Sequence, residues 1–241
     1  MKHIFEDTDS LLSAMATFFV STCRDAITAR GRFIVALSGG SSPKRLFDKL
    51  ASPAYNQQVD WSKVYFFFGD ERYVPADDPE NNALMARKAL FDPLNIPDSQ
   101  VFAINTALSP SLSAEAYAQT IQAHFQQEQA RFDLILLGLG NDAHTASLFP
   151  KTTVLREQKA TVKAVFLPDQ QVFRITLTAP LINQAREVAF LVYGAAKADA
   201  VHRVLEGKQD TSLHPAQLIQ PDKGHLHWFL DKTAASLLNQ K

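Results

Sequence analysis

The chain has 241 residues, of which 46% are hydrophobic, and this is enough for a substantial core. Its formal net charge of −1 gives no electrostatic reason to expect nucleic acid or an anionic membrane as a partner. No apolar run approaches the roughly 18 residues of a membrane-spanning helix, and the acidic N-terminus lacks the apolar core of a signal peptide. The single cysteine, Cys23, excludes an internal disulfide and favours a reducing, cytoplasmic location.

The first part of the chain predicts a helix, a strand and a second helix. Apolar residues recur at three-to-four spacing between residues 11 and 27, which predicts a helix capped at residues 7–9 and ending near Arg30. Residues 32–38 (RFIVALS) are rich in β-branched and aromatic side chains and predict a buried strand. The segment GGSSPK at residues 39–44 follows, and Ser42 before Pro43 is expected to cap the second helix.

The GGSSPK segment is also a candidate anion site. Glycines that lead into a helix leave backbone N–H groups bare at its positive dipole end, and Gly40, Ser41 and Ser42 occupy that position. The segment lacks the Gly-Lys-Ser/Thr sequence of a Walker loop, so ATP is not implied. An ordinary turn between a strand and a helix is the competing interpretation.

A second buried strand is predicted at residues 64–68 (VYFFF), and charged residues follow it directly. Asp70, Glu71 and Arg72 come after Gly69, at the end of this strand, where charges are costly to bury unless paired or solvated. A structural ion-pair cluster and a ligand site are both compatible with this pattern. Further along, the pattern predicts a helix over 82–90, a strand over 101–104 and a helix over 113–131.

The most informative stretch is FDLILLGLGNDAHTASLFP at residues 132–150. Its apolar run, 134–137, predicts a strand buried on both faces, and Gly138 and Gly140 then break the strand. Asp142 and His144 follow within four residues of that break, and a helix is expected to start near Thr145. Because an imidazole has an ordinary pKa of about 6.5, a histidine at such a strand end is well suited to act as a general base.

The same stretch satisfies the dinucleotide-binding pattern G-x-G-x-x-A, in the form GLGNDA. A carboxylate at Asp142 would repel a pyrophosphate in this turn, and the motif lies far from an opening strand–helix–strand unit. Nicotinamide or flavin binding is therefore the weaker interpretation, and no cofactor is expected.

The last third of the chain continues the alternation of strands and helices. Strands are predicted over 164–167, 174–178, 187–192 and 226–230, with a short helix from Ala179 and a closing helix from Asp231 through residue 238. Lys197 lies in the helix expected after the 187–192 strand, where a solvated surface lysine is the simplest interpretation. His225 and His227 share one strand face but have no third ligand nearby, so no metal site is expected.

Together these elements predict one layered α/β domain over residues 1–241, with a mainly parallel sheet. Four apolar runs end at Gly39, Gly69, Gly138 and Gly194, and polar residues follow each of them. Because the carboxyl ends of parallel strands lie at one edge of a sheet, we expect these polar residues to converge on a ligand site.

The chain resembles the 6-phosphogluconolactonases, in which GGSSPK, GDERYVPADDPENN, GLGNDAHTASLFP, RITLTAP and YGAAK occur in this order. The resemblance covers about residues 34–238 and places the chain in a superfamily that includes glucosamine-6-phosphate deaminases. It implies that superfamily's fold, an open, mainly parallel α/β sheet with helices on both faces. It also implies hydrolysis of 6-phospho-D-glucono-1,5-lactone in the pentose phosphate pathway, without metal or nucleotide. Two departures stand out: Ala143 replaces a usual glycine, and residues 169–173 replace a proline-rich segment.

The chain contains no G-x-S-x-G nucleophile elbow, so direct attack by water is expected, with His144 as the catalytic base. Asp142 or Asp70 would orient its imidazole, and the expected helix after His144, or an arginine, would hold the developing oxyanion. The sugar-phosphate contacts that the resemblance implies are Gly40, Ser41, Ser42, Arg72, Arg174 and Lys197. The expected partner is the lactone alone, bound by a monomer or small homo-oligomer.

Two alternative functions remain. The deaminases place a glutamate soon after the histidine, where this chain has LFP at residues 148–150, and this difference favours the lactonase. Related folds also serve as phosphosugar sensors attached to a DNA-binding helix-turn-helix. Only about thirty residues precede the first predicted strand, one helix fills them, and no basic patch is present, so the sensor is the less favoured hypothesis.

Overall fold

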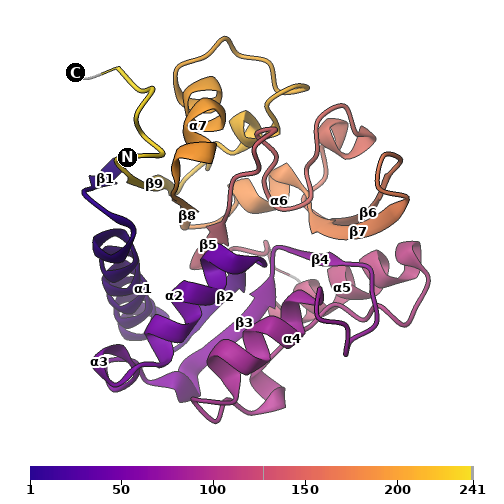
Figure 1. Cartoon of the computed structure of the whole chain (residues 1–241). Coiled ribbons are helices and arrows are strands. Elements are labelled where there is room, and N and C mark those ends of the chain that lie inside the picture. Colours follow the sequence, from indigo (N-terminus) through magenta and orange to yellow (C-terminus); the bar gives the residue numbers. More distant parts are fainter. Residues whose placement is uncertain (127, 240–241) are drawn as a thin grey trace.

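The computed structural model, which describes residues 1–126 and 128–239, is built on a six-stranded sheet with the order β1-β9-β8-β5-β2-β3 (Figure 1). Every strand pairing in it is parallel, as the alternation of strands and helices predicts. Its strands are β1 (Lys2–Phe5), β2 (Phe33–Leu37), β3 (Val64–Phe68), β5 (Leu134–Leu137), β8 (Glu187–Val192) and β9 (His225–Asp231). All residues of β5, at the centre of the sheet, and of its neighbour β2 are buried.

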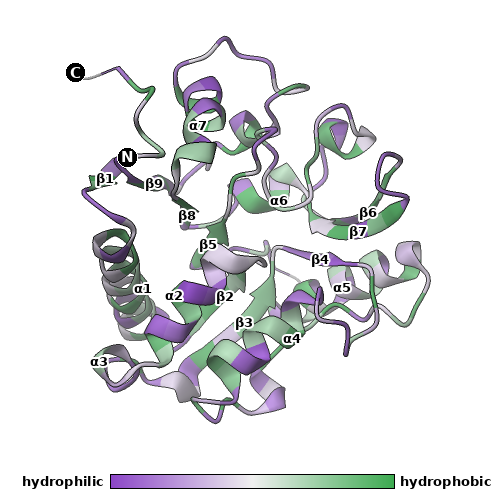
Figure 2. Cartoon of the chain, viewed as in Figure 1, coloured by the Kyte–Doolittle hydropathy of each residue, from purple (hydrophilic) through white to green (hydrophobic). Residues whose placement is uncertain are grey.

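A second, antiparallel sheet has the order β4-β7-β6 and was not expected from the sequence. Its strands are β4 (Asp70–Arg72), β6 (Val162–Leu167) and β7 (Val172–Leu177). Gly69 joins the two sheets: its N–H donates to Leu37 O at 2.8 Å, while its carbonyl accepts from Leu177 N at 2.9 Å. Figure 2 shows β4 as hydrophilic, in contrast to the hydrophobic central strands, and no apolar pattern marks it as a strand.

Helices flank both faces of the central sheet. They are α1 (Thr8–Arg30), α2 (Ser41–Ala51), α3 (Pro53–Asn56), α4 (Asn82–Ala86), α5 (Pro110–His124), α6 (Ala179–Asn183) and α7 (Ala198–Leu205). Aromatic residues of β3 show the two faces directly. The Phe66 ring contacts Phe91 with centroids 4.9 Å apart, whereas the next residue, Phe67, contacts His124 of α5 at 5.1 Å. Alternate side chains of one strand thus pack against helical segments on opposite sides.

The first helices agree with the sequence patterns in position but differ in capping. Asp7 caps α1 by accepting a hydrogen bond from Ser10 N at 2.8 Å, and Gly31 ends the helix at φ +74°. In α2 the prediction that Ser42 is the cap is wrong, because the N-cap residue is Gly40, with φ +101°, and no side chain caps the helix. Among the described residues, no helix is long and apolar enough to cross a membrane.

Four further expectations differ from the structure. The strand expected over 101–104 is a single bridge between Val101 and Phe66. The helix expected over 113–131 begins at Pro110 and ends at His124, and residue 127 lies outside the described residues. After Asp231 the chain forms turns instead of a helix, although Asp231 Oδ1 accepts from Ala234 N at 2.7 Å. The helix expected after His144 is also absent from the structure, and turns take its place.

Candidate active site

The four strands that end in glycine lie side by side, in the order β8-β5-β2-β3, so their carboxyl ends share one edge of the sheet. A cavity of about 380 Å³ lies at this edge. Residues that follow each of the four strands line it, including Gly40, Asp70, His144 and Lys197. The convergence expected from the strand ends is thus present in the structure.

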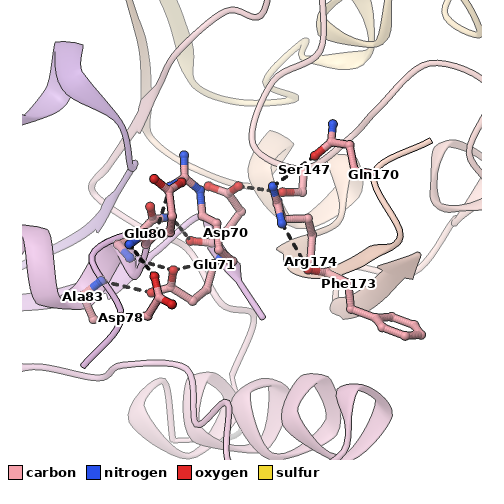
Figure 3. Close-up of polar contacts among 11 residues, drawn as sticks. Asp70, Glu71, Asp78, Glu80, Ala83, Ser147, Gln170, Phe173 and Arg174 are labelled. Atoms are coloured by element: carbon pink, nitrogen blue, oxygen red, sulfur yellow. Dashed lines mark hydrogen bonds and ion pairs between the residues drawn. The ribbon is translucent and has the colours of Figure 1, made fainter. Parts of the chain in front are cut away.

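His144 is paired with Asp142 at the edge of this cavity. Its Nδ1 lies 2.5 Å from Asp142 Oδ1, which also accepts from the His144 backbone N–H at 3.1 Å. The imidazole stacks on Phe149, with ring centroids 4.0 Å apart. Asp70 has a different partner, since its Oδ2 accepts from Ser147 Oγ at 2.6 Å (Figure 3). Of the two aspartates considered from the sequence, Asp142 is therefore the one that contacts His144.

The ionised form of Asp142 is favoured by its neighbour. Partial burial by itself would raise the pKa of this carboxyl. The hydrogen bonds and the electrostatic interaction with His144 outweigh burial, and the pKa of Asp142 lies below its ordinary value. A carboxylate that stays ionised can hold the Nδ1 proton of the imidazole, which leaves Nε2 as the acceptor.

The turn before His144 is shaped to bring this pair together. Gly140 N donates to His144 O at 2.8 Å, and Ala143 N donates to Gly140 O at 3.0 Å. A Cβ atom on Gly140 would lie 2.1 Å from His144 Nδ1 and 2.6 Å from Asp142 Oδ1, so the pair occupies the space that a side chain would need. Ala143, in place of the glycine usual in the resembled family, adopts a left-handed φ of +65°, which costs about 1 kcal/mol or more for a residue with a Cβ.

No helix follows His144, so the expected helix N-terminus cannot hold an oxyanion. The chain instead makes a bridge between Thr145 and Leu148, and Ala146 has a positive φ of +48°. The left-handed backbone of Ala146 and Lys151, and the proline at position 150, interrupt the regular geometry that a helix would need. Of the two oxyanion partners expected from the sequence, only an arginine remains.

The start of α2 forms one wall of the cavity, where Gly40, Ser41 and Ser42 all line it. Because no side chain caps the helix, its first backbone N–H groups keep no side-chain acceptor. The positive end of an 11-residue helix therefore faces the cavity, as the anion-site hypothesis requires.

Two arginines lie opposite each other on the second sheet. Arg72 of β4 and Arg174 of β7 are directly paired in the antiparallel register, and both line the cavity. Burial lowers the pKa of Arg174, and the nearby charge of Arg72 lowers it further. Like charges in this position destabilise a sheet, so an anion bound between them would be stabilising. Arg72 Nη1 donates to Glu80 O at 2.9 Å, whereas Arg174 Nη2 makes only a long contact, 3.4 Å, with Gln170 Oε1 (Figure 3).

Lys197 completes the positive lining of the cavity. It ends a short 3₁₀ turn, Ala195–Lys197, directly after β8. Partial burial lowers its pKa, whereas the charge of Asp142 acts in the opposite direction. Among the described residues that line the cavity, three side chains are permanently or ordinarily cationic (Arg72, Arg174 and Lys197) and one is a carboxylate, Asp70. This balance suits an anionic ligand.

The family model described as glucosamine-6-phosphate isomerases/6-phosphogluconolactonase matches residues 6–228. The chain belongs to this family. It is 39% identical over 240 residues to the 6-phosphogluconolactonase of Nostoc sp., covering 98% of this chain and 97% of that protein. It is 43% identical over 217 residues to the 6-phosphogluconolactonase of Synechocystis sp., covering 88% of each.

Solved structures of the family superpose closely on this chain. The 6-phosphogluconolactonase of Trypanosoma cruzi has a TM-score of 0.88 at 29% identity, covering 99% of this chain and 97% of that one. The enzyme of Trypanosoma brucei has a TM-score of 0.85 at 29% identity, covering 99% and 98%. The open α/β sheet that the sequence resemblance implies is thus confirmed.

Asn82 is not among the residues singled out from the sequence, and Glu71 is named there only as part of the charged segment after Gly69. Asn82 Nδ2 donates to the backbone carbonyl of Asp70 at 2.9 Å, and a Cβ on Gly39 would lie 1.8 Å from Asn82 Oδ1. Glu71, the middle residue of β4, is fully buried. The sequence shows the charged segment after β3, but no local sequence pattern indicates which of its side chains is buried in the protein.

The pair of histidines near the C-terminus lies at the opposite edge of the sheet. His225 Nδ1 is 3.0 Å from Glu187 Oε1, and His227 Nε2 is 2.8 Å from Glu187 Oε2. In the part of the chain that the structure describes, no group of three or more His, Cys, Asp or Glu side chains is placed to hold a metal ion. The carboxylate between the two rings accounts for their orientation.

Proposed function

We propose that this chain hydrolyses 6-phospho-D-glucono-1,5-lactone to 6-phospho-D-gluconate, with water as the nucleophile and His144 as the base. Relatives named 6-phosphogluconolactonase, at 39% and 43% identity over most of the chain, support this substrate. The observation that carries the proposal is the His144–Asp142 pair at the edge of a cavity with three cationic side chains. The substrate is a small anionic ester, and the proposed reaction uses no metal or cofactor.

In this mechanism Asp142 holds the Nδ1 proton and leaves Nε2 of His144 free to accept a proton from water. The water oxygen bonds to C1 of the lactone as its proton passes to Nε2. The C1–O5 bond then breaks, and Nε2 returns the proton to O5. A base in this position contributes about 10²–10⁴ in rate, and the Asp142 carboxylate stabilises the imidazolium formed on the way.

The remaining groups of the cavity bind and stabilise negative charge. The free N–H groups at the start of α2 donate hydrogen bonds to the phosphate, together with Lys197. Arg72 and Arg174 supply positive charge for the phosphate and for the oxyanion that develops at C1.

The chain is also proposed to act as a single domain over residues 1–241. One cluster of buried hydrophobic residues includes Leu136 of the central sheet and Ile175 of the second sheet, which supports this assignment. A cytoplasmic location and a monomer or small homo-oligomer stay predictions from the sequence.

The test is hydrolysis of freshly generated 6-phosphogluconolactone, coupled to 6-phosphogluconate dehydrogenase and corrected for spontaneous ring opening. We expect the unaltered protein to exceed the blank and His144→Ala to lose about 10²–10⁴ in kcat. His225→Ala is the matched control, because His225 also contacts a carboxylate but lies at the start of β9, at the opposite edge of the sheet.

An unaltered protein that only matches the blank would refute the proposed substrate. Release of ammonia from glucosamine 6-phosphate would then assign the deaminase activity of the same family. Full activity in His144→Ala would support the proposed substrate but refute the role given to His144.

A further inference from the structure

Glu71 is a carboxylate with no exposed surface that lies directly below the proposed substrate site. The residues on either side of it in β4, Asp70 and Arg72, both line the cavity. Because successive side chains of a strand point to opposite faces, Glu71 points away from the cavity and into the protein. It therefore cannot touch the substrate, and its buried charge needs another explanation.

The Glu71 carboxylate accepts three backbone hydrogen bonds. Its Oε1 accepts from Arg72 N at 2.8 Å and from Asn82 N at 2.7 Å, and its Oε2 accepts from Ala83 N at 3.0 Å (Figure 3). Asn82 and Ala83 are the first residues of α4, whose N–H groups have no acceptor within the helix. One carboxylate thus joins the start of α4 to β4.

The segment between the end of β4 and the start of α4 holds the side chain of Arg72. Residues 73–81 leave the end of β4 and return at the start of α4, where Glu71 accepts from the Asn82 and Ala83 N–H groups. Arg72 Nη1 donates to Glu80 O at 2.9 Å and lies 3.5 Å from Glu80 Oε2. Glu80 is two residues before Asn82, so its position depends on how firmly α4 is held against β4.

We propose that Glu71 is a positioning residue: by tying the start of α4 to β4, its carboxylate holds the Glu80 segment and thereby the Arg72 guanidinium in the substrate cavity. This inference rests on the proposed function, because it assigns Arg72 a contact with the lactone or its phosphate. Glu71 makes no contact with the reacting atoms and acts on the cavity through Arg72.

The ionisation state of Glu71 changes near neutral pH. Burial raises the pKa of Glu71 to about 7, and the charge of Asp70 adds to this, whereas the three N–H groups act against it. The other groups that interact with it electrostatically are Arg174 on β7 and the buried Tyr117 on α5. Above pH 7 the carboxylate can accept all three hydrogen bonds. Below pH 7 one oxygen carries a proton, so Arg72 should be held less firmly and KM for the lactone should rise.

The test compares Glu71→Gln with the unaltered protein in the coupled lactone assay between pH 6 and 8.5. The amide has one acceptor oxygen, so at least one buried N–H loses its partner. We expect KM at pH 8 to rise by about tenfold, with a smaller change in kcat and with a flatter dependence of KM on pH. Glu157→Gln is the matched control, because Glu157 also accepts a backbone hydrogen bond, from Lys159 N at 2.9 Å, outside the cavity lining.

A double-mutant cycle separates positioning from simple stabilisation of the fold. If Glu71 acts through Arg72, Glu71→Gln adds no further increase in KM to an Arg72→Ala variant. An equal increase in both backgrounds, or an unchanged KM in Glu71→Gln alone, would overturn the proposal.

Should Glu71→Gln fail to fold, the unaltered protein offers a second measurement. In ¹⁵N NMR spectra recorded from pH 6 to 8.5, the amide signals of Asn82 and Ala83 and the Nε–H signal of Arg72 are expected to shift with one common midpoint near pH 7. An Arg72 signal that does not follow the two amides would overturn the proposal. This titration needs no substrate, so it stays informative even if the unaltered protein shows no lactonase activity and the proposed function fails.

Discussion

Gly140→Ala is expected to remove catalysis while leaving the fold intact. The added Cβ would lie 2.1 Å from His144 Nδ1 and 2.6 Å from Asp142 Oδ1, closer than any real contact. The atoms in the way belong to the ends of two side chains, which are 29% and 48% exposed for His144 and Asp142 and so can rotate outward. The φ of Gly140 is not in the left-handed region, so alanine adds no backbone strain there.

The expected loss of kcat and the expected change in the free energy of unfolding can be worked out separately. Displacing His144 from Asp142 removes an oriented base, which is worth about 10²–10⁴ in kcat. The fold loses little, because alanine restricts the unfolded chain and offsets about 0.4–1 kcal/mol of any new crowding. We therefore expect a large loss of kcat and a change of less than about 1 kcal/mol in the free energy of unfolding.

The assay is the coupled lactone hydrolysis, with urea unfolding of the same preparations. Gly69→Ala is the matched control, since a Cβ there meets only Leu37 O at an ordinary 3.5 Å. The double variant Gly140→Ala/His144→Ala should be no slower than His144→Ala alone, because both changes remove the same group. A kcat within about twofold of the unaltered protein in Gly140→Ala would refute the role of the pair, given the 10²–10⁴ expected for a base.

Two further predictions concern binding and pH. Lys197→Ala should raise KM for the lactone by about tenfold and leave kcat nearly unchanged, because a contact with the phosphate stabilises the ground state and the transition state equally. A loss of kcat without a change in KM would contradict this prediction. For Glu71, a folded-state pKa of about 7 against 4.5 means that the folded protein holds the proton more tightly. The free energy of unfolding should therefore fall by about 3 kcal/mol as pH rises from 4.5 to 7, and Glu71→Gln should remove this slope in urea titrations.

Much of the architecture follows from local patterns in the sequence. The apolar runs at β2, β3, β5 and β8 identify strands buried on both faces, and the alternation with helices requires a mainly parallel sheet. Parallel strands bring their carboxyl ends to one edge, which explains why the residues after Gly39, Gly69, Gly138 and Gly194 could be expected to meet. His144 stood out because it lies within four residues of the glycine break that ends such a strand.

Other features depend on contacts that no local pattern reports. The second sheet pairs Arg72 with Arg174, about a hundred residues away in the chain, and this pairing places two positive charges side by side. β4 has three polar residues and no alternation, so it becomes a strand only because β7 lies beside it. The burial of Glu71 likewise depends on where α4 returns to β4.

The turn at His144 depends both on local sequence patterns and on contacts made by the whole fold. The sequence by itself predicts a buried strand, its break at the glycines, and a carboxylate and an imidazole, Asp142 and His144, just after that break. The structure alone shows that Asp142 instead of Asp70 contacts the imidazole, that Ala143 adopts a positive φ, and that turns follow in place of a helix. Periodicity reports which residues are buried, whereas the partner of a polar side chain depends on segments brought together by the whole fold.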